Sequence, residues 1–113
     1  MNIKTPKEHY GFQMGEDRKL ARWDKIVEYF WRLDTHPTVK VWQLGETTEG
    51  QPFLLAAISS PENIQNLDKI KKESYTLAHP EDTPDETIQE IIKNGKTVVS
   101  MTMSVHASEI GGT

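Results

Sequence analysis

Two short apolar runs joined by a glycine-containing connection constrain the fold of this chain most strongly. Thr38–Leu44 and Phe53–Ile58 are both rich in apolar residues, a composition typical of strands. The connection contains Glu49 and Gly50, a pair that suits a chain reversal with positive φ at the glycine. We therefore predict a β-hairpin. The second run is apolar on both faces, so we expect this strand to lie inside a larger sheet.

A helix is predicted before the hairpin. Gly15–Leu33 carries apolar residues at a helical spacing, which indicates one stripe packed against a core. Pro37 prevents continuation of that helix. The residues of the stripe are Leu20, Trp23, Ile26, Val27, Phe30 and Leu33.

Two further helices are predicted after the hairpin. Ser60 and Pro61 mark the first start, as N-cap and first helical position. Thr83 and Glu86 mark the second as a capping box, and Asn94 with Gly95 ends it. The first helix has a buried stripe of Ile64, Leu67, Ile70 and Leu77, and the second has Ile88, Ile91 and Ile92.

The last predicted element is a strand over Lys96–Val105. Val99, Met101, Met103 and Val105 share one face of it, and smaller residues share the other. Together with the hairpin, this core strand predicts an α/β fold for residues 1–113, a mixed sheet of at least three strands packed with helices. Without a neighbour, the edge of this strand would invite self-association.

Composition excludes several classes of function. The formal net charge of -4 is spread along the 113 residues, so there is no basic footprint for nucleic acid. No apolar run approaches the ~20 residues that span a membrane. The chain contains no cysteine and therefore no disulfide. The first residues lack the apolar stretch of a signal peptide; a secreted or periplasmic location follows if a leader was removed, and a cytoplasmic one otherwise.

His106 and Glu109 form a candidate pair of metal ligands. Zinc accepts imidazole nitrogen and carboxylate oxygen, and catalytic sites usually have three protein ligands plus a water. A His at the end of a strand and a Glu in the following turn can converge on one ion, and a third ligand must come from elsewhere. His9, His36 and His79 are each predicted to be solvated loop histidines.

The residues around this pair resemble the carboxypeptidase A-like zinc metallopeptidases. Ser104–Thr113 resembles the family's first zinc-binding segment, in which a core strand ends in His-x-x-Glu, and Leu44–Phe53 resembles the hairpin before it. The residues Tyr10, Gly11 and Phe12, with the helix from Arg18 to Trp23, are similar to bacterial-type members. The resemblance covers nearly the whole chain.

This resemblance implies that the chain is the N-terminal portion of a zinc metallocarboxypeptidase that hydrolyses peptide substrates. His106 and Glu109 would be the first His and the Glu of the His₂Glu ligand set. In the family, the second His, the general-base Glu and the groups that hold the substrate's carboxylate lie further along. The chain alone is therefore expected to be inactive and to bind zinc weakly. Ala107 and Ser108 stand between the ligands, where digestive members have an Arg.

Two other functions are compatible with the sequence. A related zinc amidohydrolase, such as an N-acyl amino-acid deacylase, shares the H-x-x-E pattern on a similar scaffold. The second is a non-catalytic interaction domain in which Trp31 and Trp42 form a binding surface.

Overall fold

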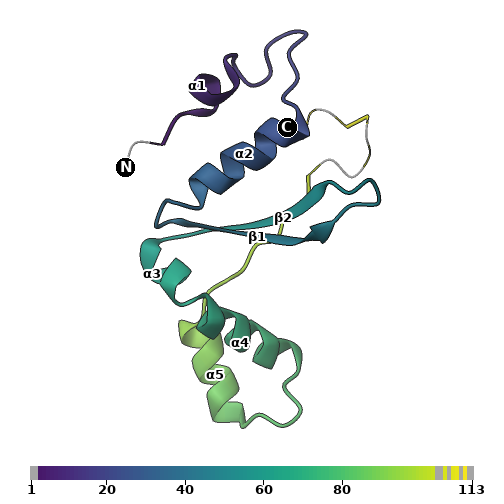
Figure 1. The fold of residues 1–113 in the computed structure, drawn as a ribbon. Coiled ribbons are helices and arrows are strands. Elements are labelled where there is room, and N and C mark those ends of the chain that lie inside the picture. Colours follow the sequence, from purple (N-terminus) through teal and green to yellow (C-terminus); the bar gives the residue numbers. More distant parts are fainter. Residues whose placement is uncertain (1–2, 104–105, 107, 110, 112–113) are drawn as a thin grey trace. The chain divides into compact units, whose positions relative to one another are not determined.

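The computed structural model describes residues 3–103, 106, 108, 109 and 111, which fall into two units (Figure 1). The first unit comprises the chain up to Ile64 together with the described residues from 102 on, and the second comprises Gln65–Met101. The first contains α1 (Pro6–Tyr10), α2 (Trp23–Leu33), β1 (Val39–Glu46) and β2 (Pro52–Ile58), and the short α3 (Pro61–Gln65) lies at the boundary. The second contains α4 (Leu67–Ala78) and α5 (Asp85–Asn94).

The predicted β-hairpin is confirmed. Strands β1 and β2 pair antiparallel, with Val41 opposite Ala56, and the register shifts at a bulge between Gln43 and Gly45. Gly50 closes the connection with φ of 71°, a left-handed conformation that glycine adopts without a steric cost. The described residues thus form a mixed α/β structure with a two-stranded antiparallel sheet and five helices.

Helix α2 covers one face of the hairpin (Figure 1). Val39 and Val41, which are two residues apart and so share a face of β1, are 8% and 2% exposed. The Trp23 indole Nε1 at the start of α2 donates to the Pro52 carbonyl at 3.1 Å. Together with Ala21, the two valines are the buried hydrophobic residues of the described chain, so the core lies under α2 and is small.

The helix predicted for Gly15–Leu33 begins eight residues later, at Trp23. Gly15 and Arg18 have positive φ values of 83° and 58°, and a right-handed helix cannot pass through such residues. Leu20 remains 57% exposed. Of the predicted apolar stripe, only the residues from Trp23 on therefore lie in a helix.

A short helix, α1, precedes α2 in a segment where no helix was predicted. Thr5 is the N-cap of α1: its hydroxyl accepts from the Glu8 amide at 3.3 Å, and the Glu8 carboxylate accepts from the Thr5 amide at 2.7 Å. This capping box satisfies two amides that a helix start leaves without partners. The Tyr29 hydroxyl on α2 donates to the Lys4 carbonyl at 2.9 Å, which fixes the entry to α1.

The helix signals after the hairpin are borne out in part. The Ser60 hydroxyl accepts from the Asn63 amide at 3.3 Å, so Ser60 caps α3 as predicted. The single stripe predicted from Ile64 on is divided between α3 and α4. The Thr83 capping box is wrong: α5 begins at Asp85 with no side-chain cap, although it ends at Asn94 as predicted.

The third strand, predicted over Lys96–Val105, is not formed by the described residues 96–103; Ser104 and Val105 lie outside them. Val99 and Met101 are 77% and 75% exposed. A strand needs a neighbour to bond its backbone groups, and these residues have the strand pattern without one. The mixed sheet of at least three strands is therefore corrected to the two-stranded antiparallel hairpin.

The outer edge of β1 is held by Asp34, the residue that follows α2. Its carboxylate accepts from the Val41 amide at 2.7 Å and from the Lys40 ammonium at 3.2 Å. The Val41 amide, and then Lys40, hold the pKa of Asp34 below its ordinary value. One side chain thus joins the end of α2 to the middle of β1.

Replacing Asp34 with alanine leaves the Val41 amide without its acceptor. We expect a loss of about 2 kcal/mol in the free energy of unfolding of the hairpin unit, as for a hydrogen bond to a charged group. Urea denaturation followed by tryptophan fluorescence measures the change. Asp82→Ala, an exposed loop position, is the matched control, and an equal effect of both substitutions would contradict the role of Asp34.

The pH dependence of this contribution has a definite sign. Because the folded-state pKa of Asp34 is depressed, its stabilisation is present above the ordinary aspartate pKa and is lost as pH falls through the folded value. The stability difference between the native chain and Asp34→Asn should therefore be largest near neutral pH and shrink below about pH 3.9. A pH-independent difference in urea titrations would rule this out.

Candidate functional site

The structure brings the predicted pair, His106 and Glu109, into direct contact. His106 Nδ1 lies 2.7 Å from Glu109 Oε1. The Glu109 amide donates to the His106 carbonyl at 3.0 Å, which closes the four-residue turn between them. Ala107, inside that turn, lies outside the described residues. The spacing of three residues therefore puts the imidazole and the carboxylate on the same side of the turn.

The carboxylate of Glu109 also binds the backbone of the turn. Its Oε2 accepts from the His106 amide at 3.0 Å, as the Glu of a capping box does for a helix N-terminus. One carboxylate thus contacts both the main chain and the side chain of His106, and this fixes the orientation of the pair. Because a carboxylate only accepts, Nδ1 carries the proton in this contact.

Both side chains are open to solvent. The side chains of His106 and Glu109 are 73% and 50% exposed. An exposed ion pair or hydrogen bond of this kind contributes little to stability. The contact joins an imidazole nitrogen to a carboxylate oxygen. Both are ligand types that zinc accepts.

The contacts of the other three histidines are with other parts of the chain. His9 is in α1, where its Nε2–H donates to the Lys25 carbonyl at 2.9 Å and its ring centroid lies 4.9 Å from that of Tyr29. His36 Nδ1 lies 2.7 Å from the Thr38 hydroxyl. His79 ends α4 and stacks on Tyr75 at 4.3 Å between ring centroids.

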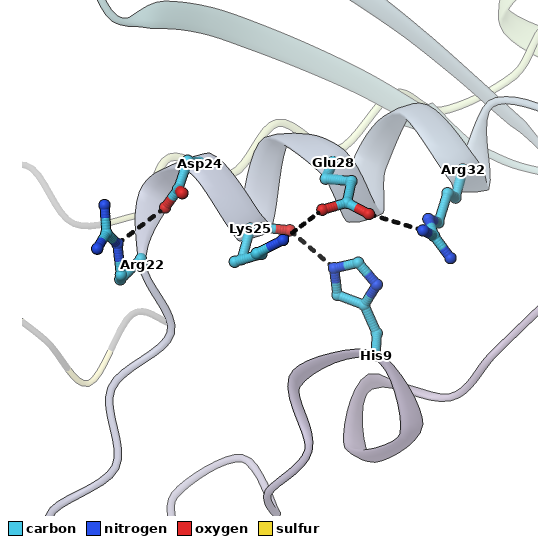
Figure 2. Close-up of polar contacts among 6 residues, drawn as sticks. All are labelled: His9, Arg22, Asp24, Lys25, Glu28 and Arg32. Atoms are coloured by element: carbon cyan, nitrogen blue, oxygen red, sulfur yellow. Dashed lines mark hydrogen bonds and ion pairs between the residues drawn. The ribbon is translucent and has the colours of Figure 1, made fainter.

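His9 therefore lies in a helix and packs against Tyr29, and the prediction of a loop histidine is wrong for it. Figure 2 shows its ring directed at the Lys25 carbonyl, beside the Lys25–Glu28–Arg32 ion pairs along α2. The signal that could have placed it is the Thr5-to-Glu8 capping box, which begins a helix just before His9.

Among the described residues no cluster of three or more His, Cys, Asp or Glu side chains could hold a metal ion. The assignment of His106 and Glu109 as zinc ligands stays a prediction. Within residues 3–103 and the described positions after them, no helix is long and apolar enough to cross a membrane.

The two tryptophans of the interaction-domain hypothesis belong to different elements. Trp31 is on α2 and is 40% exposed. Trp42 follows the buried Val41 in β1, so it lies on the hairpin face that α2 does not cover. The two side chains do not form one continuous surface in this arrangement.

Comparisons of the chain with protein-family models, with curated proteins and with solved structures found no match.

Removing the Glu109 carboxylate should open the turn. We expect Glu109→Ala to speed exchange of the His106 amide about fivefold, as loss of a hydrogen bond of about 1 kcal/mol implies. Hydrogen exchange followed by NMR measures this rate. Glu81→Ala, an exposed position in the α4–α5 connection, is the control, and an unchanged His106 rate in Glu109→Ala would show that the turn does not depend on the carboxylate.

Proposed function

We propose that this chain is the N-terminal portion of the catalytic domain of a zinc metallocarboxypeptidase, in which His106 and Glu109 are two of the zinc ligands. The observation that carries the proposal is the 2.7 Å contact between Nδ1 and Oε1 in a single turn. Support also comes from the segment around that turn, which resembles the first zinc-binding segment of the carboxypeptidase A-like family.

The residues fit a zinc ion chemically. Neutral imidazole and carboxylate are two members of the His₂Glu set found in carboxypeptidase A. The bond from Glu109 Oε2 to the His106 amide orients the carboxylate, as outer hydrogen bonds do for metal ligands in general. Zinc in such a site polarises the scissile carbonyl and lowers the pKa of a bound water.

The chain by itself supplies only part of this machinery. A third ligand, a general base and groups that hold the substrate's terminal carboxylate are proposed to come from further residues of the whole enzyme. With two exposed ligands, the 113-residue chain should bind zinc weakly and show no peptidase activity. Its part in the enzyme is to present the first two ligands and to hold them in a turn closed by Glu109.

A zinc titration of the 113-residue chain tests the ligand assignment. We expect a saturable change in the His106 imidazole signals at a dissociation constant weaker than about 1 μM, because two ligands do not complete a site. Histidine NMR follows all four imidazoles at once. His106→Ala and Glu109→Ala should each abolish the effect, whereas His79→Ala should not.

Three results would count against this assignment. They are equal broadening of all four histidines, a zinc response that survives His106→Ala, and stoichiometric binding tighter than micromolar. The last would mean that the chain already holds a complete site.

The enzymatic part is tested on a longer polypeptide that carries this sequence. We expect chelator-sensitive release of C-terminal amino acids from peptides, with kcat/KM lowered at least a hundredfold by His106→Ala; loss of an outer-shell partner alone commonly costs 10–100-fold. Hydrolysis of N-acyl amino acids in place of peptides would instead identify the related zinc amidohydrolase. Activity that resists chelation would refute both.

A further inference from the structure

The end of α5 contains an asparagine followed directly by a glycine, Asn94 and Gly95. No other asparagine of the sequence precedes a glycine. Asparagine is one of the thermolabile residues of proteins, because the backbone nitrogen of the next residue can attack its side-chain amide. Glycine in that next position favours the attack, since it has no side chain to hinder the approach of its own nitrogen. The sequence therefore places a reactive pair at the end of a helix.

A single hydrogen bond holds the nitrogen that would attack. The Gly95 amide donates to the Ile91 carbonyl at 2.7 Å, and Gly95 itself has left the helix, with φ of -67° and ψ of 170°. The last turn has to open before this nitrogen can reach the Asn94 side chain. Helix ends open at a much lower free energy than the whole fold, and α5 has no buried residue to oppose this.

The side chain of Asn94 is exposed. It takes part in none of the hydrogen bonds formed among the described residues. Asn63 differs, because its side-chain amide donates to the Ser59 hydroxyl at 2.9 Å and an isoleucine follows it. Asn66 is followed by a leucine. Asn94 is therefore the asparagine in which the smallest neighbour and an unrestrained side-chain amide coincide.

The geometry of the helix end requires glycine at position 95. A Cβ added to Gly95 would lie 2.5 Å from the Ile91 carbonyl oxygen, which is the acceptor of the bond that closes the turn. Another residue would fit only if the turn shifted. The same contact that ends α5 thus demands the residue type that makes Asn94 reactive.

We propose that Asn94 is a site of spontaneous deamidation, controlled by opening of the last turn of α5. The Gly95 nitrogen attacks the side-chain carbonyl carbon of Asn94 and gives up its proton; a new C–N bond forms, the bond to the side-chain nitrogen breaks, and ammonia leaves. Water then opens the resulting cyclic imide at either carbonyl, which gives aspartate or isoaspartate. The reaction needs only water, so it requires no partner and does not rest on the proposed zinc site.

Both products weaken the end of the helix. Each adds a negative charge at the C-terminus of α5, where the helix dipole disfavours an anion. Glu90 stands four residues earlier, and like charges at this spacing repel each other. Isoaspartate also adds a carbon to the main chain, which changes the geometry between the Gly95 amide and the Ile91 carbonyl. The modification therefore acts on the helix that packs beside α4.

Incubation of the 113-residue chain at neutral pH, followed by peptide mass spectrometry, tests the site. We expect deamidation at Asn94 at least tenfold faster than at Asn63 or Asn66, which corresponds to about 1.4 kcal/mol in activation free energy. Asn94→Gln, whose longer side chain forms the ring poorly, should remove the fast phase of ammonia release. Asn63→Gln is the matched control and should leave that phase unchanged.

Hydrogen exchange tests the dependence on opening of the turn. We expect the deamidation rate of Asn94 to rise when urea unfolds the chain. The factor should match the protection of the Gly95 amide from exchange in the folded chain, because both processes require the same hydrogen bond to break. Equal rates in the folded and unfolded chain, with a protected Gly95 amide, would refute this control by the helix end.

Two results would overturn the site itself. One is an Asn94 that stays intact for as long as Asn63 and Asn66 do. The other is a fast phase of ammonia release that persists in Asn94→Gln, which would place the reaction at another side-chain amide.

Discussion

The carboxylate of Asp34 is the interaction on which the hairpin unit depends. It stands where α2 ends, binds the amide of Val41, the most buried hydrophobic residue described, and also contacts Lys40. It thereby fixes the helix over the face that carries Val39 and Val41. The same bond satisfies an outward amide of β1 and closes that edge of the sheet. An apolar side chain at this position could fill the space but could not accept from the amide, which would remain without a partner.

The turn at His106 uses the same chemistry in a different setting. There too a carboxylate accepts from a backbone amide, and it also contacts an imidazole. The difference is exposure: the side chain of Asp34 is 24% exposed, whereas those of Glu109 and His106 are 50% and 73%. Solvent weakens the second arrangement as a source of stability, and a zinc ion would have to displace the proton between Nδ1 and Oε1. The same kind of contact thus stabilises the hairpin unit at Asp34 and closes an exposed turn at Glu109.

Local signals in the sequence predicted part of the local structure, although the capping box at Thr83 is wrong. The hairpin follows from two apolar runs around Gly50, and the start of α3 follows from Ser60 and Pro61, because turn and cap chemistry acts within a few residues. For His106 and Glu109 the spacing predicted convergence on one metal ion, which stays a prediction, whereas the structure shows the two side chains in direct contact. Thr5 and Glu8 carry the same kind of signal, although no helix was predicted at that position. The helix predicted from Gly15 begins only at Trp23, because positive φ at Arg18 interrupts the helical spacing. The Asp34 contact was not predictable, because it depends on how helix and strand pack.

The failed third strand has the same physical cause as the open edge of β2. Alternation of apolar residues records which face of a strand can be buried, but pairing requires a neighbouring backbone. Residues 96–103 have the alternation and remain exposed, and β2 is apolar on both faces while no strand of the described residues pairs with its outer edge. A pattern of this kind is therefore evidence of surface that a partner can cover, and it does not identify the partner.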